Sequence, residues 1–184
     1  MIIKNKLDSI KKINDLKLNK FPEQLFKKNE HEEVKKFLEK YPSNYYAIRD
    51  KSKINGNFKL KVCYDMVLEE IKKYELYTIN ISSANYVDSQ VLVGEIEILS
   101  NNEIYATLST NPYASVRDAL SNPDFNIKTN IFDKELNKIP YFDIIYQYID
   151  KYDLYNVIVE FAVFNKKVGI NNDNVIIYEL RTQY

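Results

Sequence analysis

Apolar residues in the first forty positions recur at the spacing of helices. A first amphipathic helix is predicted within residues 1–20, on a face made of Ile3, Leu7, Ile10, Ile13 and Leu16. Phe21-Pro22 interrupts this pattern, and Pro22 suits the first position of a second helix because that position needs no N–H donor. The second helix is predicted to run to Tyr41, where Pro42 follows and ends it.

From residue 44 onward the period changes from that of helices to the two-residue alternation of strands. Phe58, Leu60 and Val62 alternate with Lys59 and Lys61, which is typical of a half-buried strand. Shorter helical patterns lie between the strands: after Asp65, which we expect to be an N-cap, and over residues 114–121 and 141–153. We predict strands over residues 44–50, 58–62, 76–82, 91–98, 104–108, 126–132, 157–164 and 175–181.

The order of these elements predicts the fold class. Residues 91–98 and 104–108 flank the turn Asn101-Asn102 as a hairpin, and no regular strand–helix–strand alternation appears. The pattern therefore indicates an α+β fold, with a largely antiparallel sheet and packed helices, preceded by an N-terminal helical segment. We expect residues 1–42 to form that segment and residues 43–184 to form the body, within one domain overall.

Composition narrows the class of protein without naming a function. The chain has 184 residues, of which 45% are hydrophobic, so it can bury a sizeable core. Its 26 basic and 26 acidic residues balance, which makes nucleic acid an unexpected partner. No apolar run is long enough to span a membrane, and no signal peptide is evident. A single cysteine, Cys63, excludes an internal disulfide, and together these features predict a cytoplasmic protein.

Several familiar kinds of site are missing from the sequence. Three glycines cannot build a glycine-rich phosphate loop. His31 is the only histidine and is expected to be a solvated helix residue, whereas Cys63 is expected to be packed rather than reactive. The sixteen tyrosines have no matching basic stripe, which favours core packing over stacking on nucleic acid.

The chemistry that remains lies in charged residues on the last two strands. Glu160 is flanked by apolar residues, so its charge must be paired, hydrated or bound to metal. Glu179 and Arg181 are two residues apart and therefore share one face of the final strand. If the two strands pair, Glu160 and Glu179 can hold a divalent ion, with Arg181 on phosphate oxygens. The alternative is an interstrand ion pair between Arg181 and one glutamate.

Two other arginines are candidates for phosphate binding. Only three of the basic residues are arginine, and only arginine offers a planar fork that matches phosphate. Arg49 ends an early strand, and Arg117 lies in the helical turn after Asn111-Pro112. Each could bind phosphate or form a surface ion pair of under about 1 kcal/mol.

The strands VIVEFAVF and VIIYELRT resemble the end of the nucleotide-binding half of phosphoenolpyruvate synthase and pyruvate phosphate dikinase. That ATP-grasp module ends in an Ile-Glu-Trp-Ala strand, a hairpin and a strand finishing in Gln-Ala-Arg-Pro. The segment YAIRDKS is similar to the family's phosphate-binding Arg-Ser-Ser segment, INGNF is similar to the stretch after it, and VLVGEIEILSNNEIYATLSTNP is similar to its central strands. The resemblance spans roughly residues 44–184.

The resemblance implies that Glu160 matches the family's metal-binding glutamate, Glu179 stands in place of its metal-binding glutamine, and Arg181 matches the arginine that follows. It implies an abbreviated ATP-grasp-like domain that binds ATP or another phosphorylated ligand with Mg²⁺. The sequence departs from the family at Glu179 and Thr182 and lacks the glycine-rich segments and the swivelling phosphohistidine domain, so dikinase activity is not expected. The competing hypothesis is a non-enzymatic interaction module in which the same charges are structural ion pairs.

Overall fold

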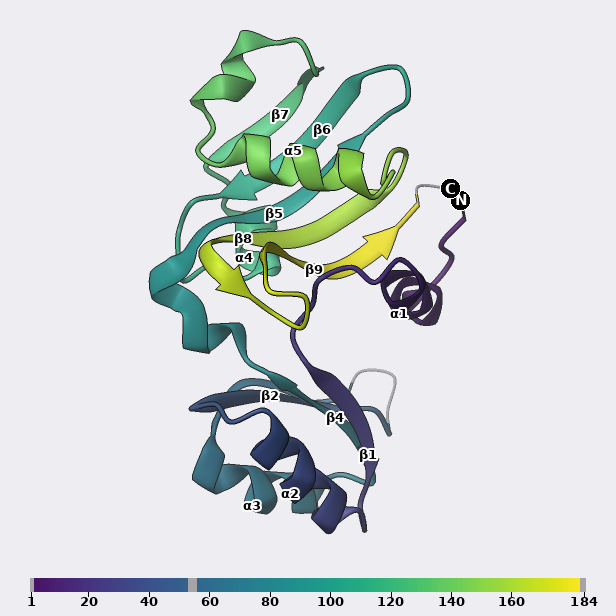
Figure 1. The fold of residues 1–184 in the computed structure, drawn as a ribbon, viewed down its shortest axis with the longest axis vertical. Helices are drawn as coiled ribbons and strands as arrows, with labels where there is room; N and C mark the ends of the chain where they lie inside the picture. Colours follow the sequence, from purple (N-terminus) through teal and green to yellow (C-terminus); the bar gives the residue numbers. More distant parts are fainter. Residues whose placement is uncertain (1, 53–55, 183–184) are drawn as a thin grey trace. The chain divides into compact units, whose positions relative to one another are not determined.

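A computed structural model describes residues 2–52 and 56–182 of the chain, without the side chain of Leu7. Residues 54 and 55 of the INGNF loop therefore lie outside the described residues. The chain divides into two compact units: residues 21–87, and residues 1–20 together with 88–184 (Figure 1). Both units combine antiparallel strands with helices, which confirms the predicted α+β class.

The unit of residues 21–87 is a four-stranded antiparallel sheet in the order β1-β4-β2-β3, with helices on one face (Figure 1). A core of aromatic and β-branched side chains forms between the sheet and these helices, and includes Phe26, Phe37, Tyr77 and Ile79. Its elements are β1 (Glu23–Lys27), α2 (His31–Lys40), β2 (Tyr45–Asp50), β3 (Phe58–Cys63), α3 (Val67–Glu70) and β4 (Leu76–Ile81).

The second predicted helix is wrong at its start, where the structure has β1. Phe26 is buried and lies 5.8 Å from the Phe37 ring and 6.0 Å from the Tyr77 ring. Pairing of β1 with β4 is a tertiary contact, and it overrides the local helical pattern. The helix begins only at His31, which is exposed as expected. The division of the chain at residue 42 into segment and body stays a prediction.

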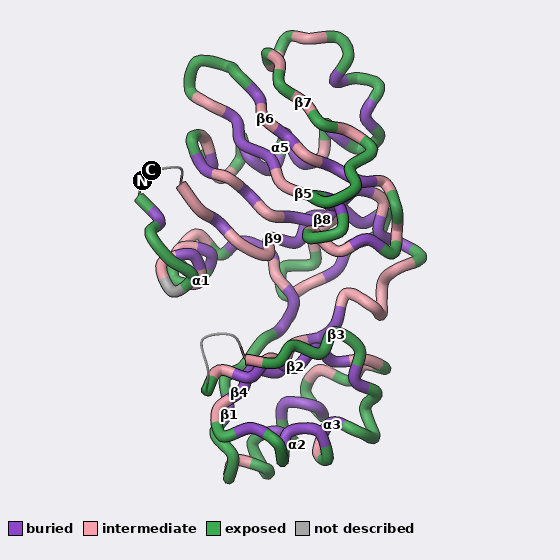
Figure 2. Tube along the Cα trace, turned by 180° about the vertical axis from the view of Figure 1, so that it is seen from behind, coloured by how far each residue is buried: buried purple, intermediate pink, exposed green. Residues whose placement is uncertain are grey.

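The strand β3 lies at a sheet edge, and two expectations about it are corrected. Phe58 and Leu60 are 49% and 41% exposed, and Val62 is the one buried residue of the strand. Most of β3 is therefore exposed, as Figure 2 shows. Cys63 is exposed rather than packed. An edge strand has a neighbour on only one side, so alternation along it does not ensure burial. Asp65 lies within the 3₁₀ turn Tyr64–Met66 and does not cap a helix.

The other unit is a five-stranded antiparallel sheet in the order β7-β6-β5-β8-β9. In Figure 1, α5 lies across one face of this sheet and α1 lies beside β9. Ile145 and Ile149 of α5 and Ile13 of α1 belong to the same apolar core as the sheet. Its elements are α1 (Lys6–Asp15), β5 (Gln90–Ile98), β6 (Glu103–Ser109), α4 (Val116–Ser121), β7 (Phe125–Asn130), α5 (Phe142–Lys151), β8 (Ile158–Val168) and β9 (Asp173–Arg181).

A buried asparagine ties the segment after α1 to the β8–β9 hairpin. The Asn19 side-chain nitrogen donates to the carbonyl oxygens of Val168 and Val175, at 2.9 and 2.8 Å. Its side-chain oxygen accepts from the N–H of Asn171, and its own N–H donates to the Tyr148 hydroxyl. These bonds satisfy backbone groups at the hairpin that the sheet ladder does not reach.

None of the helices in the described ranges is both long enough and apolar enough to cross a membrane.

Candidate functional site

Three glutamates lie side by side on one face of the five-stranded sheet. In the strand register, Glu95 of β5 is opposite Glu160 of β8, and Glu160 is opposite Glu179 of β9. Opposed residues of antiparallel strands point to the same face, with Cα atoms about 4.5–5.5 Å apart. We call these three residues the glutamate row. The neighbouring residues on these strands point to the other face and belong to the apolar core there. They are Ile96 on β5, Val159 on β8 and Leu180 on β9.

A β-bulge puts Glu179 on this face. Phe161 is opposite Ile177, but Glu160 is opposite Glu179, so Tyr178 is an extra residue in β9. Without that extra residue, Glu179 would be opposite Val159 and would point into the apolar core. After the bulge, the side chains of β9 point to the opposite faces from those they would otherwise take. Glu179 and Arg181 therefore lie on the same face as Glu160.

Gly94 allows β6 to approach β5 closely beside Glu95. Its φ is 154°, and a Cβ atom there would lie 2.1 Å from the carbonyl oxygen of Thr107. No other residue fits this contact, so glycine is required where the central strand carries the first glutamate of the row.

Two basic residues neutralise much of the row's charge. One guanidinium nitrogen of Arg181 donates to Glu160 at 2.6 Å, and the other donates to Glu95. Lys6 of α1 lies 3.3 Å from a carboxylate oxygen of Glu179. The interstrand ion pair that the sequence left open as an alternative is therefore present, and Arg181 bridges two carboxylates rather than one.

The pKa of Glu160 is raised above its ordinary value. Burial is the largest cause, and the negative charge of Glu179 adds to it, while Arg181 acts in the opposite direction. Its side chain is only 19% exposed, compared with 23% for Glu95 and 27% for Glu179. A carboxylate in these surroundings is stabilised by any additional cation that approaches the row.

The two other predicted arginines do not join the row. Arg117 is exposed in the first turn of α4, next to a capping box in which Ser115 and Asp118 bond reciprocally. Arg49 lies on β2 in the unit of residues 21–87, and its guanidinium lies over the Phe58 ring at 4.7 Å from the centroid. Their roles in phosphate binding stay predictions.

The carboxylates of the row are the type of ligand that Mg²⁺ takes, but they do not form a complete metal site by themselves. Mg²⁺ takes oxygen ligands and is commonly held by one or two carboxylates together with phosphate oxygens and water. Within residues 2–52 and 56–182, no group of three or more His, Cys, Asp or Glu side chains is arranged to hold a metal ion. The row therefore offers carboxylate oxygens of the type that Mg²⁺ takes but does not by itself provide a complete set of ligands.

No protein-family model matches the chain, and no curated protein matches it. Among solved structures, the macrocyclase MdnC bound with precursor peptide MdnA from Microcystis aeruginosa MRC is similar, at a TM-score of 0.50 and 12% sequence identity, over 96% of this chain and 50% of that chain. The fold is ATP-grasp-like. The narrower resemblance to phosphoenolpyruvate synthase and pyruvate phosphate dikinase stays a prediction.

Two further solved structures match at lower scores. D-alanyl-alanine synthetase A from Vibrio cholerae has a TM-score of 0.47 and 11% identity, over 97% of this chain and 55% of that chain. The ADP complex of purK, N5-carboxyaminoimidazole ribonucleotide synthetase, has a TM-score of 0.45 and 12% identity, over 98% of this chain and 45% of that chain. This chain thus spans about half the length of the structures it resembles.

Sequence reasoning missed Glu95 and Lys6 as members of this site. Glu95 stands in the alternating segment Val93–Ile98, which signals one polar face, but the pairing of β5 with β8 spans more than sixty residues of sequence. Lys6 is one of many lysines, and nothing local distinguishes it. Strand order brings Glu95 into the site, and the packing of α1 brings in Lys6. The spacing of residues along the sequence predicts neither of these.

Proposed function

We propose that this chain binds ATP or another phosphorylated ligand together with Mg²⁺ at the glutamate row of its five-stranded sheet. The observation that supports this most strongly is the glutamate row bridged by Arg181 within an ATP-grasp-like fold. Glu160 and Glu179 would supply carboxylate oxygens to the metal, and Arg181 would bind phosphate. Mg²⁺ neutralises phosphate charge when it is bound.

Arg181 is suited to exchange between two partners. Its planar fork matches carboxylate and phosphate geometry equally well. In the absence of ligand the fork satisfies Glu160 and Glu95, and on binding it would turn to a phosphate oxygen while the metal takes over the carboxylates. Before binding, the row's three carboxylates face two basic side chains, and on binding Mg²⁺ would replace the positive charge that Arg181 takes to the phosphate. This replacement keeps the cost of the exchange low.

Arg49 and Arg117 are proposed as further phosphate-binding arginines, on the strength of their planar forks. The single cysteine supports a reducing compartment, and we propose the cytoplasm as the site of action.

A non-enzymatic interaction module is the second candidate, and one observation favours it. Arg181 and Lys6 already pair with all three glutamates of the row. On this view the row holds β5, β8, β9 and α1 together and binds no ligand.

A thermal-shift titration separates the two candidates. ATP with Mg²⁺ is added to the wild type, to Glu179→Ala and to a matched control, Glu135→Ala, which removes the exposed ion pair with Lys138. A ligand at 100 times its dissociation constant stabilises the folded state by about 2.7 kcal/mol. We expect a shift in the wild type and the control and a much smaller one in Glu179→Ala. The absence of a shift with any nucleotide would favour the interaction module.

A further inference from the structure

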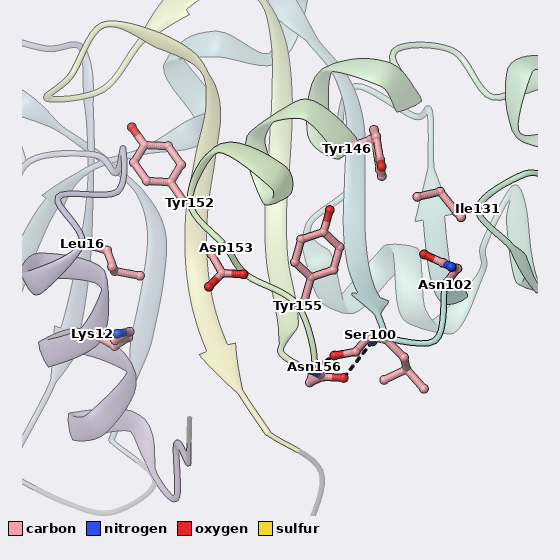
Figure 3. Close-up of a pocket in the computed structure, with 11 residues that line it drawn as sticks. Lys12, Leu16, Ser100, Asn102, Ile131, Tyr146, Tyr152, Asp153, Tyr155 and Asn156 are labelled. Carbon is pink, nitrogen blue, oxygen red and sulfur yellow. Dashed lines mark hydrogen bonds between the residues drawn. The ribbon is translucent and has the colours of Figure 1, made fainter.

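A groove lies in the unit of residues 1–20 and 88–184 (Figure 3). Its volume is about 700 Å³, and no glutamate of the row lines it. It is formed by α1, by the turn between β5 and β6, and by the end of α5 with the segment after it. Because α5 packs on the apolar face of the sheet, the groove and the row belong to opposite sides of that sheet. Its volume is in the range of small-molecule sites.

Tyrosine rings form much of the groove wall, and one of them is held in place. The Tyr155 hydroxyl donates to Asp150 at 2.8 Å. This hydrogen bond, followed by burial, raises the pKa of Tyr155 well above its usual value, so the phenol stays neutral. Tyr146 and Tyr152 also line the groove, and the ammonium of Lys151 lies over the Tyr152 ring at 4.9 Å. Neutral, fixed aromatic faces are suited to stacking with a ligand ring.

A rigid polar floor joins this wall to the β5–β6 turn. Asn156 adopts a left-handed backbone, with φ of 59°, and its N–H donates to the carbonyl oxygen of Ile98 at 2.8 Å. Its side-chain oxygen accepts from the Ser100 N–H at 3.0 Å, and its side-chain nitrogen donates to the Ser100 hydroxyl (Figure 3). These bonds fix the floor before any ligand binds, which reduces the entropic cost of binding.

Two opposite charges line the groove without neutralising each other. Lys12 comes from α1 and Asp153 from the segment after α5 (Figure 3). Neither side chain takes part in an ion pair among the residues that the structure describes. A groove that presents a cation and an anion beside aromatic faces complements a ligand with the same three features.

We propose that this groove binds a small zwitterion that carries an aromatic ring, of the class of an aromatic α-amino acid. Asp153 binds the ligand's ammonium, Lys12 binds its carboxylate, and the ring packs on the tyrosine wall around Tyr155. Charge-assisted hydrogen bonds are about twice as strong as neutral ones, so the two charged ends set the specificity. The proposal does not depend on nucleotide binding at the glutamate row.

Isothermal titration with three related compounds tests the proposal. L-phenylalanine carries both charges, N-acetyl-L-phenylalanine lacks the ammonium, and L-phenylalanine amide lacks the carboxylate. We expect the wild type to bind L-phenylalanine with a dissociation constant on the order of 1 mM or lower, and to bind each derivative about ten-fold more weakly. Equal affinity for the three compounds, or no binding of L-phenylalanine up to about 10 mM, would overturn the proposal.

Two variants assign the charges. Asp153→Asn keeps a residue that tolerates the left-handed backbone at this position, where φ is 52°. It should weaken binding of L-phenylalanine about ten-fold but leave binding of the N-acetyl compound unchanged. Lys12→Gln should weaken binding of L-phenylalanine about ten-fold but leave binding of L-phenylalanine amide unchanged, because the amide lacks the carboxylate that Lys12 binds. The control Lys11→Gln, on the same helix but outside the groove, should change neither; a similar loss in the control would contradict the assignment.

Competition separates this site from the proposed nucleotide site. Saturating L-phenylalanine should leave the affinity for ATP with Mg²⁺ unchanged, because the two sites lie on opposite sides of the sheet. Displacement of one ligand by the other would refute the placement in the groove, whereas failure of ATP to bind would leave the phenylalanine result standing.

Discussion

Glu70 offers the most quantitative prediction about the stability of the fold. Its carboxylate is buried on α3 and bonds to Lys59 at 2.9 Å, to Lys73 at 2.7 Å and to the Tyr74 hydroxyl at 2.8 Å. Burial raises the pKa of Glu70, but the three hydrogen bonds outweigh it and lower the pKa from 4.5 to about 2. The charged form is therefore stabilised by folding.

The sign and size of the effect follow from linkage between folding and protonation. Because the folded pKa lies below the unfolded one, the stabilisation is complete above pH 4.5 and is lost as pH falls toward 2. The full shift corresponds to about 3 kcal/mol. Both lysines are at least half exposed, so solvent screening reduces this, and we expect roughly 1–3 kcal/mol.

Urea-induced unfolding of the wild type and of Glu70→Gln, followed by circular dichroism, measures this difference. At pH 7 the variant should be less stable by roughly 1–3 kcal/mol, and the gap should narrow as pH falls from 5 to 2. The control Glu135→Gln removes an exposed ion pair and should change stability by less than about 1 kcal/mol at either pH. Parallel loss of stability in wild type and Glu70→Gln would refute the reasoning.

Four further substitutions test the packing. The buried Tyr77 hydroxyl has no hydrogen-bond partner among the described residues, so Tyr77→Phe should keep or raise the melting temperature, whereas Tyr74→Phe, which removes a bond to Glu70, should lower it. Asn19→Ala should reduce the free energy of unfolding by about 2–4 kcal/mol, because it leaves buried backbone groups unpaired; a loss below about 1 kcal/mol would contradict this role. Gly169→Ala should destabilise by about 1–3 kcal/mol in the same unfolding assay, because φ is 77° and the added Cβ would lie 2.5 Å from the Asn19 side-chain oxygen; unchanged stability would contradict the contact.

Runs of apolar residues bounded by polar turns predicted the strands of the larger sheet close to where they lie. The sequence also indicated that Glu160 and Glu179 can come near each other if the last two strands pair, and the two residues lie opposite each other in the register. The bulge at Tyr178 was readable in principle, because the apolar positions of β9 shift by one residue between Ile177 and Leu180.

The errors fall where distant parts of the chain decide the structure. The helix predicted to begin at Pro22 gave way at its start to pairing of β1 with β4, more than fifty residues away. The exposure of Phe58 reflects the edge position of β3, and Glu95 joined the row through a strand order that no local pattern encodes. Local propensity is a weak prior in such cases, because cross-strand packing decides the outcome.

The affinity for ATP in the presence and absence of Mg²⁺ tests the central claim most directly. Isothermal titration of the wild type should show binding with Mg²⁺ that weakens when the metal is chelated, and Glu160→Gln should abolish that metal dependence. The same affinity with and without Mg²⁺, or the same metal dependence in Glu160→Gln, would contradict metal and phosphate binding at the glutamate row.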